Sequence, residues 1–249
     1  MTVVILLFAL LIGSFLNVCI YRIPRNELIS FPPSHCTNCN TSLKPVDLIP
    51  VLSYLYLKGS CRYCGEKISP KYPIVEAFNG ILWVILYLRF GLSVEFYGFA
   101  VLSSLLLVIS AIDLEIQEIP DGLNIFGCVT GIIYITVQWD INLVLSSFAG
   151  LLIGSGLFFL IAFLSKGGMG GGDIKLMGVL GIWVGWKLTL LLILLSFVIG
   201  ALVSVFLIIM KIKSRKDYIP FGPFIAIGAY IAIIFGDFLI NWYFNFLIF

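Results

Sequence analysis

The sequence predicts an all-α, polytopic membrane protein with about eight transmembrane helices and a small zinc-binding loop domain. Of its 249 residues, 61% are hydrophobic and 11% are charged, whereas soluble domains carry roughly 25% charged residues. The mean hydropathy is +1.11. Apolar runs recur at close to the ~20 residues that span a bilayer as a helix. One hydrophilic segment interrupts them and holds two cysteine pairs.

The apolar runs determine the expected helices. They lie at 2–21, 76–90, 94–113, 122–138, 143–165, 173–187, 188–210 and 221–248. Long runs with few breaks favour helices over a β-barrel, whose strands are short and alternating. The basic residues Arg22 and Arg25 follow the first run rather than precede it, which favours a retained helix over a cleaved signal peptide. We therefore divide the chain into a first helix at 1–21, a loop domain at 22–75 and a transmembrane core at 76–249.

Small and polar residues in the helices suggest how the helices pack. Three glycine pairs have the small-xxx-small spacing that lets helix backbones approach closely, namely 127 with 131, 150 with 154, and 181 with 185. Asn17 lies inside the first apolar run, where a hydrogen bond to a neighbouring helix is the expected use of its amide. Asp121 follows Pro120 and is expected to be the N-cap of the fourth helix.

The distribution of lysine and arginine predicts the orientation. With eight spans, thirteen of the fifteen basic residues fall on one side of the membrane. These are Arg22, Arg25, Lys44, Lys58, Arg62, Lys67, Lys71, Lys166, Lys175, Lys211, Lys213, Arg215 and Lys216. Only Arg89 and Lys187 fall on the other side. Because basic loops stay in the cytoplasm, the loop domain at 22–75 is predicted to be cytoplasmic.

The loop domain carries four cysteines with the spacing of a metal-ligand set. Cys36 with Cys39, and Cys61 with Cys64, form two CxxC pairs about twenty residues apart, the spacing of a four-thiolate zinc site. Disulfides and a redox pair are the alternatives. A reducing cytoplasm disfavours disulfides, and no βαβ context supports a thioredoxin-like motif. We predict a structural zinc site; His35 could replace a ligand, but a surface position is expected for it.

Two aspartates at helix ends are the candidate catalytic residues. Asp113 closes the third apolar run, and Asp173 opens the sixth, both on the predicted cytoplasmic side. Each could also serve as a helix-end charge or cap. Asp173 follows a glycine-rich stretch that includes Gly170 and Gly172, and glycine lets a backbone approach a substrate closely. Two neighbouring carboxylates that share one proton can activate water and polarise a carbonyl, which is aspartic peptidase chemistry.

Six motifs follow one another along nearly the whole chain. They are 13–18 (GSFLNV) with 21–24 (YRIP), 32–36 (PPSHC) with the CxxC pairs, 68–76 (ISPKYPIVE), 111–113 (AID) with 119–121 (IPD), 170–176 (GGGDIKL), and 219–223 (IPFGP). In this order they resemble the motifs of the type IV prepilin peptidases, membrane enzymes that also act as N-methyltransferases.

The resemblance implies a function and roles for particular residues. Asp113 and Asp173 would be the catalytic aspartates, with Gly170, Gly172 and Lys175 supporting the catalytic loop. The enzyme would lie in the plasma (inner) membrane of a prokaryote, among membrane lipids, and would cleave the leader of prepilins or pseudopilins after a glycine at the cytoplasmic face. It would then methylate the new N-terminus with S-adenosylmethionine. Glu76 is a candidate for the methyl-donor site, or else a helix-end charge.

Two other classes of protein fit parts of the sequence. A proton-coupled transporter would also use carboxylates and glycine-broken helices, but its acids would lie near the bilayer midplane. A membrane thiol oxidoreductase would use the CxxC pairs, but on the oxidising side. The net charge of +2 gives no support for nucleic-acid binding.

Overall fold

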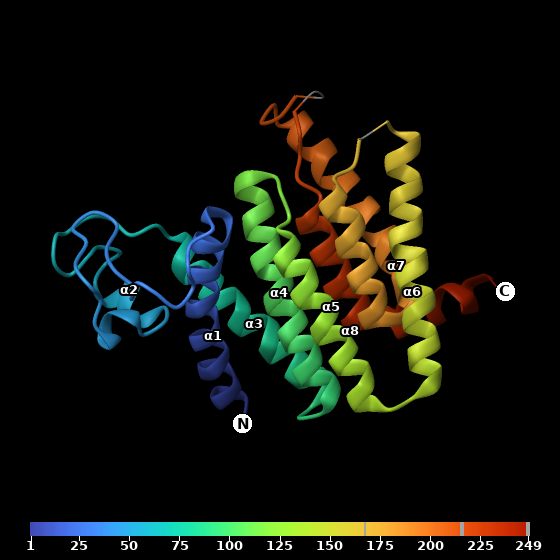
Figure 1. The fold of residues 1–249 in the computed structure, drawn as a ribbon, viewed down its shortest axis with the longest axis horizontal. Coiled ribbons are helices and arrows are strands. Elements are labelled where there is room, and N and C mark those ends of the chain that lie inside the picture. Colours follow the sequence, from blue (N-terminus) through green and yellow to red (C-terminus); the bar gives the residue numbers. More distant parts are fainter. Residues whose placement is uncertain (167, 215–216, 248–249) are drawn as a thin grey trace. The chain divides into compact units, whose positions relative to one another are not determined.

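The chain is built from helices in a computed structural model that describes residues 1–166, 168–214 and 217–247. The long helices are α1 (Thr2–Arg22), α3 (Lys71–Phe90), α4 (Val94–Ile116), α5 (Asp121–Gln138), α6 (Ile141–Leu164), α7 (Gly171–Ile209) and α8 (Gly222–Leu247) (Figure 1). Between α1 and α3 lie the short elements η1 (Ile23–Arg25), η2 (Pro45–Leu48) and α2 (Leu52–Tyr56). Gly167, Arg215, Lys216 and the predicted end of the last helix at 248 lie outside the described residues.

Within those described ranges, six helices are long and apolar enough to cross a membrane. They are α1, α3, α4, α6, α7 and α8. The all-α, multi-pass membrane fold is therefore confirmed. The predicted fourth span, α5, is a helix of 18 residues that is not among the six, and α7 counts as one helix where the sequence predicts two.

The discrepancy at α7 has a clear cause. A straight helix of its 39 residues would be about 58 Å long, twice the ~30 Å of the hydrocarbon core. Gly185 interrupts it with φ 74° and ψ 173°, a conformation that glycine adopts without a Cβ penalty. Both ends of α7 lie at the same end of the helical bundle (Figure 1). The segments 171–184 and 186–209 thus run in opposite directions, as predicted, with the break two residues earlier than expected.

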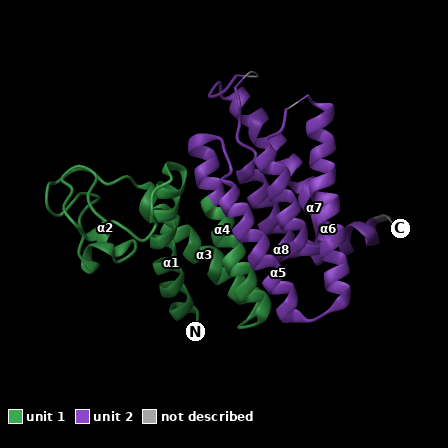
Figure 2. Cartoon of the chain, in the orientation of Figure 1, with its two compact units in different colours: residues 1–108 green, residues 109–249 purple. Residues whose placement is uncertain are grey.

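The chain forms two compact units, residues 1–108 and residues 109–249, whose boundary falls within α4 (Figure 2). In the first unit, α1 packs closely on α3. A Cβ atom on Gly13 would lie 2.7 Å from the Cα atom of Glu76, so the two backbones touch there. The Asn17 side chain donates a hydrogen bond of 3.0 Å to the Tyr72 carbonyl, which confirms its predicted role between helices.

In the second unit, α7 packs against α5, α6 and α8. A Cβ atom on Gly150 or Gly181 would collide with the backbone of the other helix, and one on Gly154 would collide with the Met177 carbonyl. The Trp183 indole N–H donates to the buried Gly127 carbonyl at 2.9 Å. The predicted packing roles of these glycines are confirmed.

The N-terminus of α5 differs from the prediction. Its N-cap is Pro120, with no side-chain cap, and Asp121 is the first helical residue. Pro120 has an extended ψ of 130° and is itself the cap, so the helix begins at Asp121, one residue earlier than a cap at Asp121 would allow. Asp121 remains favourable in the first turn because its charge complements the helix dipole.

Candidate active site and metal centre

Asp113 and Asp173 lie at helix ends within the second unit. Asp113 is near the C-terminal end of α4 and Asp173 is in the first turn of α7, with exposed fractions of 3% and 5%. The N-cap of α7 is Gly170, in an extended conformation, so Asp173 is the third residue of the helix rather than its cap. Buried carboxylates at these positions are costly unless they are hydrogen-bonded or functional.

Glycines bring the ends of α4, α7 and α8 together. A Cβ atom on Gly172 would lie 2.9 Å from the Cβ atom of Ile119, so the start of α7 packs against the segment that follows α4. At the start of α8, the Gly222 N–H donates a buried hydrogen bond of 2.8 Å to Oδ2 of Asp113. A Cβ atom on Gly222 would lie 2.6 Å from the same oxygen. The close approach of the start of α8 to the Asp113 carboxylate therefore requires glycine at 222.

The two carboxylates lie near enough to interact electrostatically. The charge of Asp113 acts on Asp173. In the loop before α8, the pKa of the Tyr218 phenol is raised, first by burial and then by the negative charges of Asp173 and Asp113. Sequence reasoning left open whether the two aspartates meet, and the helix packing of this unit brings them together.

Lys175 lies two residues beyond Asp173 but contacts a different acid. Its Nζ atom is 2.7 Å from Oδ1 of Asp121, and the two side chains are 56% and 65% exposed. This ion pair joins the first turn of α7 to the first turn of α5. It is a surface contact between helix ends.

Sequence reasoning missed two groups near the aspartates. One is the backbone N–H of Gly222, which a search for reactive side chains cannot find. The other is Tyr218. Gly222 lies in the motif at 219–223 and Tyr218 directly precedes it. The presence of that motif was therefore the sequence feature that could have pointed to both groups.

The four loop cysteines form one cluster in the first unit. The Sγ atoms of Cys36, Cys39, Cys61 and Cys64 all lie within 4.8 Å of one another, and those of Cys36 and Cys64 are 3.8 Å apart. Four thiolates at the usual Zn–S distance of about 2.3 Å in a tetrahedron would be about 3.8 Å apart. The residues therefore fit a four-coordinate zinc ion. Exposed His35 is not part of the cluster.

The cluster is built from two knuckles with the same hydrogen bonding. The Cys36 N–H donates to the Thr41 carbonyl, and the Asn40 N–H donates to the Cys36 carbonyl. In the second knuckle, the Cys61 N–H donates to the Glu66 carbonyl, and the Gly65 N–H to the Cys61 carbonyl. Asn40 and Gly65 have φ values of 54° and 74°. Each tight turn thus ends on a residue type that tolerates left-handed backbone.

The thiols of the cluster differ in acidity. Hydrogen bonding of Cys39 with the Thr41 side chain and backbone lowers the pKa of the Cys39 thiol to about 6. The pKa of Cys64 is raised to about 11 by burial and the neighbouring Cys61 and Cys39 thiols, against the effect of a hydrogen bond from the Glu66 backbone. A bound metal ion would deprotonate all four thiols.

Glu76 lies on the first turns of α3, where α3 meets α1 and the loop domain. It is 8% exposed, and one oxygen accepts a hydrogen bond of 2.7 Å from the Val51 N–H. The polar side chains of Ser14 and Asn17 lie near its carboxylate. Glu76 is therefore a buried, positioned carboxylate and not a charge at the surface.

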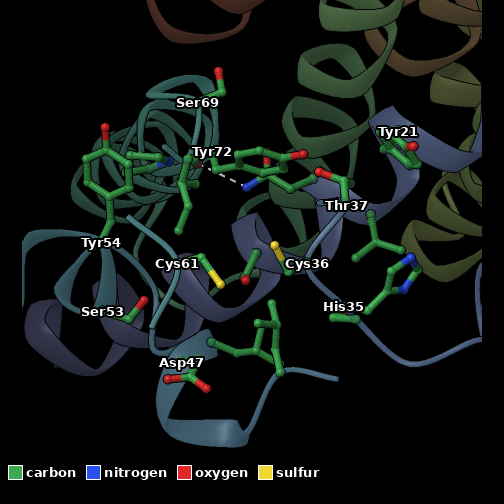
Figure 3. Close-up of a pocket in the computed structure, with 18 of the residues that line it drawn as sticks. Tyr21, His35, Cys36, Thr37, Asp47, Ser53, Tyr54, Cys61, Ser69 and Tyr72 are labelled. Carbon is green, nitrogen blue, oxygen red and sulfur yellow. Dashed lines mark hydrogen bonds between the residues drawn. The ribbon is translucent and has the colours of Figure 1, made fainter. Parts of the chain in front are cut away.

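Glu76 lines a cavity of about 750 Å³ within the first unit, between the cysteine knuckles and the ends of α1 and α3. Figure 3 shows Tyr54 and Tyr72 at one end of this cavity and Asp47 at the other, with Cys36 and Cys61 between them. Asp47 is held by Nε of Arg62 at 2.6 Å and the Tyr63 hydroxyl at 3.0 Å. These bonds lower the pKa of Asp47 even though burial opposes them.

Comparison with known proteins gives a consistent result along the chain. Residues 7–90 match the family model described as Bacterial Peptidase A24 N-terminal domain, and residues 100–205 match the Type IV leader peptidase family. No solved structure matches the chain.

Curated relatives share the name prepilin leader peptidase/N-methyltransferase. The protein of Bacillus subtilis is 35% identical over 243 residues, covering 96% of both chains. That of Pseudomonas putida is 36% identical over 254 residues, covering 92% of this chain and 88% of its own. That of Legionella pneumophila is 34% identical over 271 residues, covering 98% of this chain and 94% of its own.

Proposed function

Because this chain belongs to the type IV leader peptidase family, we propose that it is a membrane aspartic endopeptidase with a second, N-methyltransferase activity. It cleaves the leader from type IV prepilins or pseudopilins and then methylates the new N-terminal residue. The observation that carries this proposal is the buried pair Asp113 and Asp173, assembled at the ends of α4 and α7.

We assign the two aspartates to peptide hydrolysis. Neighbouring carboxylates do not readily ionise together, so the pair holds one proton between them. The ionised carboxylate takes a proton from water as the water attacks the scissile carbonyl, and the protonated one donates a hydrogen bond to the carbonyl oxygen. The Gly222 N–H holds Oδ2 of Asp113, which leaves the other oxygen for the water. Gly170 and Gly172 support this loop by allowing close backbone packing.

The site should face the cytoplasm of a prokaryotic cell. In the second unit, the C-terminal end of α6 and both ends of α7 lie at the same end of the bundle (Figure 1). Lys166 follows α6, and Lys211 and Lys213 follow α7; basic loops are retained on the cytoplasmic side. The end of α4 that carries Asp113 lies at this same end. A substrate leader would therefore be cut at the cytoplasmic face of the inner membrane.

We propose that zinc is the ion held by Cys36, Cys39, Cys61 and Cys64. A closed shell of four thiolates leaves no open coordination position, so the ion has a structural role. It would fold residues 22–75 into a small domain, separate from a peptidase core at 76–249. The matched geometry of the two knuckles supports this assignment.

S-Adenosylmethionine is the proposed methyl donor, and Glu76 is the proposed residue for its site. When bound, the donor would supply a methyl group from its positively charged sulfur; the S–CH3 bond would break and the sulfur would leave as the neutral thioether of S-adenosylhomocysteine. The new N-terminal amine must lose a proton to water so that its lone pair can accept the methyl group. A carboxylate that is buried yet lines a cavity suits the recognition of a cationic molecule.

A cleavage assay in membranes tests the proposal. A prepilin-like substrate is co-expressed with the wild-type chain, and the mass of the product is measured. Loss of the leader together with a gain of one methyl group supports both activities. A substrate that keeps its leader with several prepilin sequences tested would overturn the peptidase assignment and favour a transporter.

A further inference from the structure

Asn124 is a buried polar residue of α5, in the second unit. It is 4% exposed, and within the described ranges of the chain neither Oδ1 nor Nδ2 of its amide has a hydrogen-bond partner. A side-chain amide carries two donor hydrogens and one acceptor oxygen, and burying it without partners disfavours folding. Such a group is therefore a candidate for contact with a substrate or ligand.

The other buried asparagines that the structure describes do have partners. Both lie in the first unit, and Asn17 donates a hydrogen bond of 3.0 Å to a carbonyl of α3. Asn79 donates to the Ala9 carbonyl at 2.7 Å and accepts from the Ser104 hydroxyl at 2.8 Å. Asn124 thus departs from the way in which this chain treats its buried amides.

Two serine hydroxyls also lack a partner, but at a smaller cost. They are Ser110 Oγ and Ser147 Oγ, the other buried side-chain atoms without one among the described residues. A serine hydroxyl in a helix can rotate to donate to the carbonyl four residues earlier, as those of Ser155 and Ser196 do at 2.7 and 2.8 Å. The amide of Asn124 has a donor end and an acceptor end, and one rotation does not satisfy both.

Asn124 lies on the face of α5 that packs against α7. It shares this face with Gly127 and Gly131, which follow it by three and seven residues. The Gly127 carbonyl accepts a hydrogen bond of 2.9 Å from the Trp183 indole N–H. A Cβ atom on Gly131 would lie 2.8 Å from the same indole nitrogen. The amide is therefore buried between two packed helices.

The position of Asn124 along α5 brings it to the end of the bundle that carries the aspartates. The ion pair of Lys175 with Asp121 places the first turn of α5 beside the first turn of α7, which also holds Asp173. Asn124 follows Asp121 by three residues, which is about one helical turn. An extended peptide advances about 3.3 Å per residue, so a few residues suffice to reach from one group to the other.

We propose that Asn124 binds the main chain of the prepilin substrate beside the scissile bond. Its Oδ1 atom accepts a hydrogen bond from a backbone N–H of the substrate, and its Nδ2 atom donates one to a backbone carbonyl. The proposal rests on the peptidase activity proposed above and adds a substrate-binding residue to the same site.

The chemistry of an extended peptide matches that of the buried amide. A peptide that is not helical leaves its backbone N–H and carbonyl groups unpaired, and each needs a partner once it is buried. Proteins often hold extended peptides by main-chain hydrogen bonds. The side chain of Asn124 has the same donor and acceptor as a peptide group, so this contact is independent of the side chains of the substrate.

Asn124→Leu tests the proposal, because leucine has the same number and branching of heavy atoms but no polar group. The kcat/KM for prepilin cleavage by the solubilised full chain should fall by about tenfold or more. The melting temperature should equal or exceed that of the wild type, because no hydrogen bond within the protein is lost. Unchanged cleavage, or a loss that accompanies a lower melting temperature, would overturn the proposal.

Ser147→Ala is the matched control. Ser147 is 2% exposed and also lacks a partner among the described residues. It lies near the N-terminal end of α6, at the opposite end of the second unit from the start of α7 (Figure 1). This variant should cleave prepilin within about threefold of the wild type. A loss as large as that of Asn124→Leu would show that any change to a buried polar group slows cleavage, and would overturn the proposal.

Substrates with altered backbones test the contact directly. In synthetic prepilin segments, each peptide bond within three residues of the cut, apart from the scissile one, is replaced in turn by an ester, which lacks the N–H. At least one ester should lower kcat/KM by about tenfold for the wild type and by less than about threefold for Asn124→Leu. Equal losses for both enzymes, or no loss for the wild type, would overturn the proposal.

Asn124→Ala takes the place of the leucine variant in this comparison if the latter does not fold, as judged by its melting curve. The alanine side chain also lacks the amide and adds no bulk, so the same difference between substrates is expected. A wild type that cleaves prepilin but is insensitive to every ester would refute this inference alone. A wild type that cleaves no prepilin would refute the peptidase proposal itself.

Discussion

The cysteine cluster and the aspartate pair are assembled by different physical means. The cysteine cluster comes from two short knuckles, each closed by hydrogen bonds within five residues. The aspartates are 60 positions apart, as their numbers show, and Asp113 is held by an N–H that is 109 positions away. One site depends on local turns and on the metal ion that we propose for it, and the other depends on the packing of transmembrane helices.

Because they are assembled differently, the two sites should tolerate different substitutions. The fold and metal binding of the cysteine cluster should depend on the four cysteines and little on helix packing. The aspartate pair should depend on small residues where helices meet, because an added methyl group would move a whole helix end. The following predictions separate these two dependencies.

The largest expected effect comes from the aspartates themselves. Asp113→Asn and Asp173→Asn should each reduce prepilin cleavage by at least about a hundredfold, because general acid–base catalysis contributes on the order of 10²–10⁴. Leader removal measured by mass spectrometry gives the rate. Zinc content should equal that of the wild type, since no cysteine is changed. Normal cleavage by either variant would contradict the proposed pair.

Loss of a loop cysteine should have the opposite pattern, with the metal content reduced more than the rate of cleavage. Cys61→Ser should release the metal and unfold the loop domain, because metal binding provides folding free energy on the order of 10 kcal/mol in small zinc sites. Metal analysis and limited proteolysis of the loop measure this. Methylation should be lost, and cleavage should fall less than in the aspartate variants.

Cys128→Ser is the matched control, since Cys128 lies in α5 and outside the cluster. It should keep a full complement of metal. Metal retained by a variant that lacks all four loop cysteines would disprove the site.

The contrast between a locally built cysteine cluster and an aspartate pair built by helix packing also explains what could be predicted from the sequence. The CxxC spacing predicts directly which four cysteines cluster, because each knuckle is a local structure. Apolar length located the helices, and the reversal at Gly185 agrees with the predicted change of helix near 187. Composition could not show that Gly222 donates to Asp113, because a backbone contact between distant segments leaves no side-chain pattern. The Asp121 cap was mispredicted because the extended Pro120 is the N-cap, so the helix begins one residue earlier, at Asp121 itself.

A matched pair of glycine variants probes the packing that holds the aspartates. Gly172→Ala should reduce cleavage by about tenfold, because its Cβ atom would lie 2.9 Å from Ile119 and displace the start of α7. Overpacking of this kind costs about 1–3 kcal/mol. Gly171→Ala should cleave normally, because nothing lies within 4 Å of its added Cβ atom. Equal activity of the two variants would show that the α7 terminus can shift without harm to the site.

The smallest expected effect concerns Lys175. Its ion pair with Asp121 joins side chains that are 56% and 65% exposed, and exposed pairs contribute about 0–1 kcal/mol. Lys175→Ala and Asp121→Asn should therefore change the cleavage rate by less than about threefold, with a similar change at high salt, and the double variant should match the single ones. A tenfold loss in Lys175→Ala that Asp121→Asn does not share would mean that the lysine acts on Asp173 or on the substrate. In that case the aspartate site would depend on a charge at its rim as well as on the packing of its helices.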